Sequence, residues 1–375
     1  MKMMFLKRFF TVATVAVVLV SVKVTAYAVS STVAVVAEQA EASGVHEVEN
    51  ALPNGADELL GDLRVTDMLR GENVVERLVE GIFTRLREIV VSALKNAAVI
   101  IMAAMLSGIF TSAFPDKSGN YARLAGVLAI SAVAVSSVNT FIGMGVVVIE
   151  DLSFFSRALL PCLTAAAAAS GAVTSATVKY AATMLFMDVA MSVLRGVVMP
   201  LIYAFCAASV AEAALGGDAL SGIASLIKWL AKTAMSLIVV VFVIYISLTG
   251  VISGATDAAT LRAAKVAIST VLPVVGTILA DAAGTVLSGA SMLKSAVGIF
   301  GVLAVAATCA VPFLKLGVNY LLFKAAGGLA GAVADKSISR LIDAFGAAFG
   351  LTLGVTGAVA MMLFVSIVSM IKAVA

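Results

Sequence analysis

Long blocks of hydrophobic residues fill most of the chain, and polar residues interrupt these blocks only briefly. A helix needs about 20 apolar residues to cross the ~30 Å hydrocarbon core of a bilayer. Blocks of this length recur between residues 91 and 252 and again between 296 and 375. The pattern predicts an all-α, polytopic membrane protein with about seven spans. We expect an amino-terminal membrane bundle over 91–252 and a carboxyl-terminal membrane bundle over 296–375.

The composition supports this class of protein. Hydrophobic residues make up 62% of the 375 residues and charged residues only 13%, whereas a water-soluble domain carries about 25% charged residues. The mean hydropathy is +1.11. The formal net charge of +3 is small, and no dense basic run could follow a phosphate backbone, so nucleic acid is not an expected partner. The expected partner is the lipid bilayer.

The amino terminus has the pattern of a secretory signal peptide. Three basic residues precede an apolar run at 9–22, and a small-residue cleavage site ends at Ala28. We therefore expect a cleaved signal peptide over 1–28, which leaves the new amino terminus outside the cytoplasm. An uncleaved signal anchor is the alternative, and the short apolar run disfavours it.

Two further segments precede the first span. Residues 29–71 are polar, rich in small residues and locally acidic, and they predict a flexible extracytoplasmic leader. From 72 to 90, apolar residues recur at helical spacing while Glu and Arg occupy the opposite face, which predicts an amphipathic helix. This helix would lie on the membrane surface or on a partner, or it would simply lead into the first span.

The stretch from 253 to 295 is apolar enough for a membrane, yet it is patterned as a pair of amphipathic helices on either side of Pro273. We expect its helices to be amphipathic or re-entrant, with a polar path or docking face. The residues of this face are Arg262, Lys265, Thr277, Asp281, Thr285 and Ser288. With an outside amino terminus, the distribution of basic residues places the stretch on the cytoplasmic side, together with Lys117 and Lys336.

One predicted span contains two charges. Asp188 and Arg195 are seven residues apart, hence two turns along one helical face. Each would cost about 2.5–3.5 kcal/mol in hydrocarbon, so both should face the bundle interior or water. A polar pathway and a charge pair that fixes packing are both compatible with this spacing. The element from 181 to 215 also contains Pro200 and is either one kinked helix or two half-segments.

The last span carries three glycines at intervals of four residues, Gly346, Gly350 and Gly354. Small residues in this pattern allow helix backbones to approach closely within a membrane. We expect this face to pack against another helix.

Residues for catalysis or cofactor binding do not stand out. His46 is the only histidine, and the three cysteines are far apart within apolar runs, so neither a metal site nor a catalytic His arrangement is indicated. Residues 331–337 approach a phosphate-binding loop but have Asp335 where the second glycine is required. We expect no enzymatic activity and no cofactor. Any energy for transport must come from an ion gradient or a separate motor protein.

Several motifs are specific enough to indicate a family. The run from Leu272 to Gly276 (LPVVG) and the run from Ser291 to Gly301 (SMLKSAVGIFG) resemble the carboxyl-half signature of the stage III sporulation protein AE family. Leu160-Pro161 before the alanine run and Met199-Pro200-Leu201 are similar to the same family. At Gly284 the family often has a further acidic residue, which weakens any case for a carboxylate pair here.

The resemblance implies a role in endospore development. It implies a multi-pass subunit of the mother-cell membrane around the forespore, permease-like or export-gate-like, in a channel or secretion apparatus. Its partners would be other stage III sporulation proteins of the same operon, including a separate ATPase, and a homo-oligomer is compatible with this role. Two alternatives stay open: an autonomous secondary transporter with its site at broken helices near Pro200 and Pro273, and a membrane scaffold that assembles the apparatus.

Overall fold

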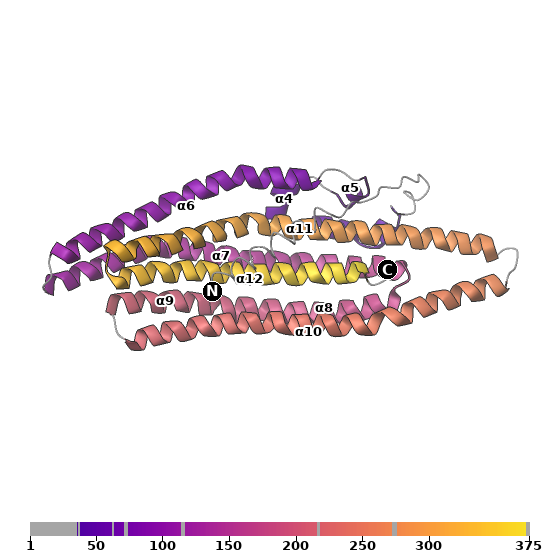
Figure 1. Ribbon diagram of the computed structural model, residues 1–375. Coiled ribbons are helices and arrows are strands. Elements are labelled where there is room, and N and C mark those ends of the chain that lie inside the picture. The colour runs from indigo at the N-terminus through magenta and orange to yellow at the C-terminus, as the bar shows by residue number, and fades with distance from the viewer. Residues whose placement is uncertain are drawn as a thin grey trace.

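The computed structural model describes residues 36, 38–61, 64–70, 74–113, 117–215, 218–271 and 276–372, and within these ranges it is helical and contains no strand. The predicted signal peptide over 1–28 lies outside them. The long elements run side by side in an elongated bundle (Figure 1): α6 (Val74–Ala113), α7 (Lys117–Ala169), α8 (Val173–Val193), η1 (Leu194–Val198), α9 (Met199–Leu215), α10 (Asp218–Val271), α11 (Gly276–Val333) and α12 (Lys336–Ile371). Six helical segments are long and apolar enough to cross a membrane. The expected all-α polytopic class is confirmed.

These helices are much longer than a bilayer is thick. The 58 residues of α11 extend for about 87 Å at 1.5 Å per residue, compared with ~30 Å of hydrocarbon. The bundle therefore projects beyond the bilayer.

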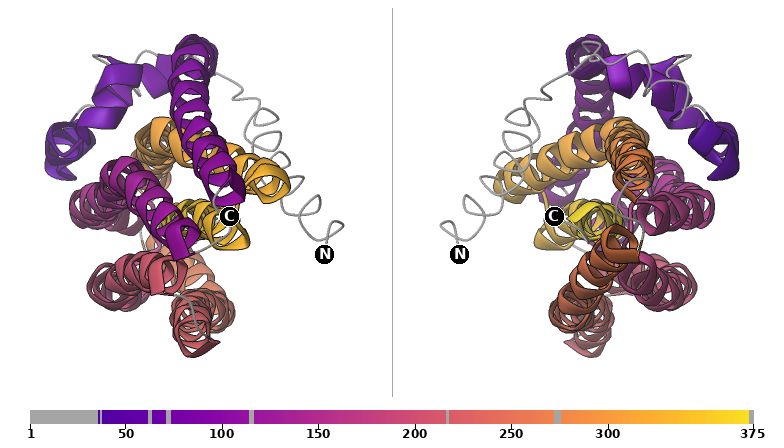
Figure 2. Two further views of the ribbon diagram at one scale, coloured as in Figure 1. Left: turned by 90° about the vertical axis from the view of Figure 1, so that its left-hand side faces the viewer. Right: turned by 90° about the vertical axis from the view of Figure 1, so that its right-hand side faces the viewer.

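Helix α12 lies at the centre of the bundle (Figure 2). It contacts α11, α7, α9, α10 and α8. Phe349 of α12 is fully buried, and its ring meets the rings of Phe323 on α11 and Phe141 on α7 edge-on, with centroids 4.9 and 5.1 Å apart. Such edge-to-face pairs stabilise by about 0.5–1.5 kcal/mol beyond the area they bury. Aromatic packing therefore fixes α12 against two neighbours at once.

Two helices continue through segments that have the sequence pattern of a break. The polar residues from Glu150 to Arg157 are typical of a short turn but are part of α7, and α11 continues through Pro312 and Lys315. In α7 the physical reason is that Glu150 and Arg157 form ion pairs with the neighbouring helix and need no loop to reach water. The continuous helices give six long apolar helical segments, compared with the expected seven or so spans.

The sequence is compatible with either one kinked helix or two half-segments over residues 181–215. The structure has a single helical rod from Val173 to Leu215, in which Leu194–Val198 form one π-helical turn. Proline has no N–H to donate, and its ring clashes with the carbonyl four residues earlier, here that of Gly196. A wider turn directly before Pro200 relieves this clash and keeps the rod continuous.

The leader is more structured than expected over its second half. Three short helices, α3 (Val45–Asn50), α4 (Asn54–Leu60) and α5 (Val65–Arg70), pack against the long helices. Val48 of α3 and Ala56 of α4 are fully buried, and α4 is joined to α6 by an ion pair of 2.6 Å between Glu58 and Arg85. Of the expected amphipathic helix at 72–90, the described residues 74–90 form the first part of α6, which continues into the apolar segment that follows.

The direction of the helices changes the expected topology. The α6–α7, α9–α10 and α11–α12 turns lie at one end of the bundle, and the α7–α8 and α10–α11 turns lie at the other (Figure 1). The α10–α11 hairpin, which contains Arg262, projects beyond its neighbours there. The expectation that Arg262 shares a side with Lys117 and Lys336 is therefore wrong. Lys336 and Arg340 follow a turn at the first end, which favours that end for the cytoplasm.

We expect cysteines at positions 262 and 46 to be labelled from the same side of the membrane, and a cysteine at position 336 from the opposite side. The test uses the variants Arg262→Cys, His46→Cys and Lys336→Cys, each with the three native cysteines replaced by alanine. An impermeant maleimide is applied to intact and to permeabilised cells, and a site that is labelled only after permeabilisation lies on the cytoplasmic side. Labelling of positions 262 and 336 from one side would contradict the antiparallel arrangement.

Glycine permits the closest helix crossing between α6 and α11. A Cβ atom at Gly108 would overlap the carbonyl oxygen of Val333, whereas one at Gly143 of α7 would meet nothing. We expect Gly108→Ala to lower the free energy of unfolding by about 1–3 kcal/mol, the usual cost of overpacking. The matched variant Gly143→Ala should be neutral or stabilise by up to about 1 kcal/mol, through helix propensity. Thermal unfolding in detergent compares the two, and equal effects would contradict the proposed packing.

Candidate functional site

A row of polar side chains joins α7 to the rod of α8, η1 and α9 along the outside of the bundle. We call this row the polar seam. Its members are Asn139, Glu150 and Arg157 on α7, and Asp188, Arg195 and Tyr203 on the opposite rod. No other face of the described bundle carries ion pairs in the middle of two apolar helices.

Two ion pairs form one half of the seam. The Arg157 guanidinium donates to the Asp188 carboxylate at 2.6 Å, and Arg195 pairs with Glu150 at 2.5 Å. The charges are seven residues apart on each helix, and the two helices run antiparallel, so an acid on one always meets a base on the other. Short charge-assisted contacts of this kind are among the stronger polar interactions in proteins.

A third contact extends the seam. The Tyr203 hydroxyl donates to Asn139 Oδ1 at 3.4 Å, which is long for such a bond. From Asn139 to Arg157 the seam follows α7 for about 27 Å at 1.5 Å per residue, which is close to the ~30 Å thickness of the hydrocarbon core.

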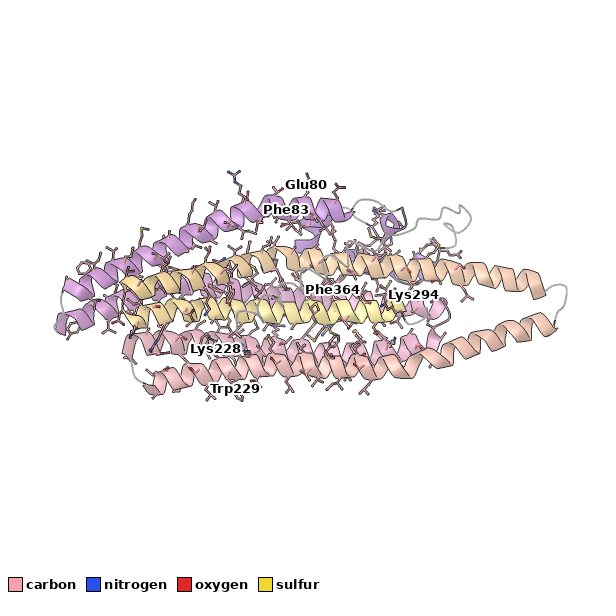
Figure 3. The ribbon with its side chains drawn as sticks, in the orientation of Figure 1. Glu80, Phe83, Lys228, Trp229, Lys294 and Phe364 are labelled. Atoms are coloured by element: carbon pink, nitrogen blue, oxygen red, sulfur yellow. The ribbon has the colours of Figure 1, made fainter. Side chains whose placement is uncertain are left out.

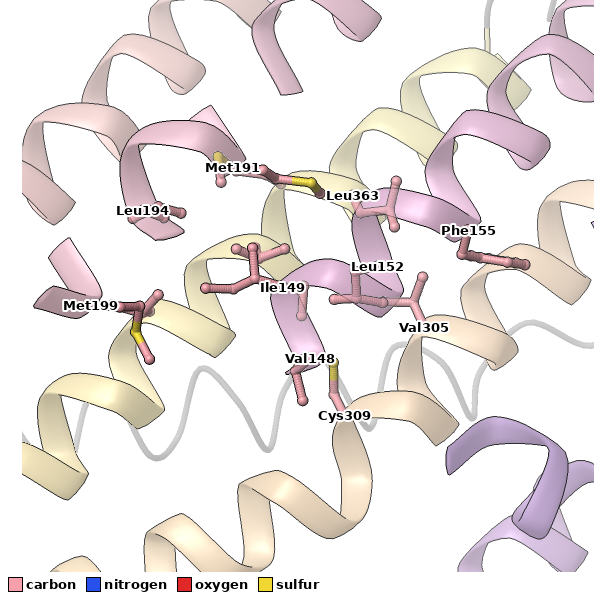
Figure 4. Packing of buried hydrophobic residues seen from close by; sticks show 14 of the residues in the cluster. Val148, Ile149, Leu152, Phe155, Met191, Leu194, Met199, Val305, Cys309 and Leu363 are labelled. Carbon is pink, nitrogen blue, oxygen red and sulfur yellow. The ribbon is translucent and has the colours of Figure 1, made fainter. Parts of the chain in front are cut away.

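The same helices bury their other faces. Ile149, Leu152 and Phe155 alternate with the seam residues along α7 and lie in the buried core, to which Met191 and Leu194 of the opposite rod also belong (Figure 4). This apolar packing fixes the helix separation and leaves the charged side chains on the outside. The local periodicity of the sequence thus produces both the core and the seam.

The seam is exposed in the protomer. Exposed fractions are 62% for Arg157, 59% for Asp188, 59% for Arg195 and 41% for Glu150. Facing hydrocarbon, these charges would lose hydration that their mutual attraction offsets only in part. The seam therefore suits contact with water or with a polar surface of another subunit.

The predicted residues Asp188 and Arg195 both lie in the seam, but they do not pair with each other. Each binds a partner on α7. These partners, Glu150 and Arg157, are not among the predicted site residues because their local pattern is that of a polar turn. The signal that could have found them is their spacing of seven residues, which equals that of Asp188 and Arg195.

The structure places the other candidate residues away from the seam. Ser288 is exposed on α11. The side chains of Arg262, Lys265, Thr277, Asp281 and Thr285 lie outside the described ones, although their backbones belong to α10 and α11. On α12, a Cβ atom at Gly346 would come within 3.2 Å of Phe323, one at Gly350 within 2.8 Å of Tyr320, and one at Gly354 within 3.2 Å of Met235.

Metal-binding chemistry is not evident in the described part of the chain, where no group of three or more His, Cys, Asp or Glu residues could hold an ion. Cys162, Cys206 and Cys309 are free and buried. What the seam can do is therefore electrostatic: it can line an aqueous path or bind a complementary polar surface.

Comparison with known proteins gives one consistent result. The profile of the family Stage III sporulation protein AE (spore_III_AE) matches residues 58–374. A relative called "Stage III sporulation protein AE" from Bacillus subtilis (strain 168) is 27% identical over 240 residues, which cover 64% of this chain and 60% of the relative. No solved structure is significantly similar to this chain.

Reversal of one seam charge should weaken the bundle, and reversal of both partners should restore it. We expect Arg157→Asp, which faces two carboxylates toward each other, to lower the melting temperature in detergent. The double variant Arg157→Asp/Asp188→Arg should recover most of the loss, with a coupling energy of about 1 kcal/mol or less if water reaches the pair. Arg87→Asp combined with Asp188→Arg is the control and should give no recovery. A double variant as unstable as the sum of its single variants would refute the pairing.

Proposed function

Because this chain belongs to the stage III sporulation protein AE family, we propose that it is a non-enzymatic membrane subunit of the channel or secretion apparatus between the mother cell and the forespore. Family membership and six membrane-capable helical segments make it a sporulation membrane protein. The proposal adds that it is permease-like or export-gate-like and lies in the mother-cell membrane around the forespore.

The polar seam is the observation that carries the channel role. A row of exposed polar side chains about 27 Å long, two pairs of which are charged, is costly against lipid on an otherwise apolar bundle, but it is stable against water or a second polar surface. If several copies assemble with their seams facing inward, the seams line a continuous hydrated path. A homo-oligomer of this kind needs no catalytic group in the chain.

The shape of the bundle suggests where partners bind. We propose that the α10–α11 hairpin, with Arg262, Lys265 and Asp281, is a docking arm on the side of the amino terminus, which is the gap between the two membranes. A separate ATPase and other stage III proteins would then meet the opposite, cytoplasmic end. This division follows from the antiparallel order of the helices (Figure 1).

An autonomous secondary transporter is the less favoured function. Such transporters often bind their substrates where spanning helices are interrupted near the bilayer midplane. The rod through Pro200 contains only one π turn and does not unwind. One of the two expected break points is therefore absent.

We expect a seam cysteine to react with a water-soluble maleimide and a lipid-facing cysteine to be protected. Asn139→Cys tests the seam, and Val240→Cys on the outer face of α10, which is 54% exposed in the protomer, is the matched control. Both are placed in a background that lacks the native cysteines, in sporulating cells that carry this chain as their only copy. Position 139 should react about tenfold faster or more, because the thiolate is the reactive form and apolar surroundings suppress it.

Spore yield of the same strains links the seam to function. Modification at position 139 should reduce forespore development, while reagent added to the Val240→Cys strain should leave it unchanged. Equal protection of both cysteines would place the seam against lipid or a dry interface and contradict the hydrated path.

A further inference from the structure

A second polar region lies away from the polar seam. Helices α9, α10, α11 and α12 line an open pocket of about 460 Å³ near the ends of α9 and α11 and the starts of α10 and α12. We call it the basic pocket. Its charged lining residues are Glu212, Lys228, Lys324, Arg340 and Asp343.

The charges of the basic pocket do not balance. Lys324 pairs with Asp343 at 2.5 Å, and Arg340 with Glu212 at 3.8 Å. Lys228 is the third cation, and it has no salt bridge to any residue that the structure describes. Its ammonium lies 5.5 Å from the centre of the Phe205 ring, a cation–π contact that compensates little of its charge. The lining therefore carries one excess positive charge, which a bound anion would neutralise.

Hydroxyl groups line the pocket beside Lys228. Ser221, Ser225 and Lys228 follow one another at helical spacing on the face of α10 that borders the pocket. Ser209 and Ser339 already donate to backbone carbonyls, at 2.8 and 2.7 Å. The hydroxyls of Ser221 and Ser225, by contrast, form no hydrogen bond within the described structure. Two free hydroxyls and one ammonium on a single face match the oxygens of a tetrahedral oxyanion.

The residues next to Lys228 indicate where the anion comes from. Trp229, the only tryptophan of the chain, is 58% exposed beside Lys228 (Figure 3). Lys232 is also exposed, one turn further along α10. Tryptophan and lysine are typical of the headgroup level of a bilayer. Basic pockets between membrane helices are suited to phosphate headgroups.

We propose that the basic pocket binds a phosphate monoanion, presented by an anionic phospholipid, with Lys228, Ser221 and Ser225 as its donors. The bound phosphate supplies the negative charge that the pocket lacks and joins α10 to the α11–α12 pair. This site is independent of the channel role, since it rests on different residues and on a different helix interface.

The single tryptophan makes the site measurable in the purified full-length protein. Brominated phosphatidylglycerol and brominated phosphatidylcholine are compared as quenchers of Trp229 fluorescence in reconstituted vesicles. We expect the native chain to prefer the anionic lipid. Lys228→Gln should lower this preference about tenfold, because a charge-assisted hydrogen bond is lost. Lys232→Gln is the matched control, since it removes a lysine outside the pocket, and it should retain most of the preference.

A second arm separates a lipid from a soluble source of phosphate. Inorganic phosphate is titrated into the delipidated protein in detergent, and the shift in melting temperature is recorded for the native chain, Lys228→Gln and Ser225→Ala. A shift that depends on Lys228, without a preference for the anionic lipid, assigns the pocket to free phosphate. A lipid preference that Lys228→Gln leaves unchanged, or that Lys232→Gln lowers equally, overturns the proposal, as does the absence of both effects in variants that melt like the native chain.

Discussion

A charged side chain on an apolar membrane helix must find a counter-charge or water, and this constraint determines much of the bundle. Helix α7 can continue through Glu150 and Arg157 because Arg195 and Asp188 lie opposite. Helices α11 and α12 are joined near their turn by Lys324 and Asp343. The buried Lys179 donates to the carbonyl of Ser369 at 3.2 Å, near the carboxyl end of α12, where the helix dipole favours a cation. In each case, the pairing sets the register of two helices.

The class of fold could be predicted from the sequence because length and hydropathy alone identify membrane helices. The polar turn before Lys336 was equally readable, and there the Asp335 carboxylate accepts from the Ser337 N–H. The turn after Ala169, where Gly171 adopts a positive φ of 98°, was not readable, because apolar and small residues continue on both sides of it. The continuity of α7 was not readable. Glu150 and Arg157 have the local pattern of a turn, and only their partners on another helix make them part of a span. Long-range pairing of this kind leaves no mark in a local hydropathy window.

The side of the membrane on which each loop lies was also not predictable from local patterns alone. The positive-inside rule assigns successive loops to alternate sides of the membrane, so it requires the correct number of crossings. When two expected spans are in fact one continuous helix, every later loop is assigned to the wrong side. The structure resolves this by helix direction, which places the α10–α11 hairpin at the end opposite Lys117 and Lys336 (Figure 1). With that correction, the basic residues between α6 and α7 and between α11 and α12 and the predicted signal peptide favour the same orientation.

The two polar regions differ in a way that separates their roles. In the seam, each cation has its own carboxylate, and the pairs are exposed, so the seam is electrically neutral and can face water or a polar surface without binding one particular ion. In the basic pocket three cations face two carboxylates, and four helices contribute to its lining, so a bound anion restores neutrality. A neutral row favours passage or subunit contact, because tight binding would retain what passes. A concave pocket with an unbalanced charge favours a resident ligand that holds α10, the least buried of the membrane-capable helices in the described chain, against the core.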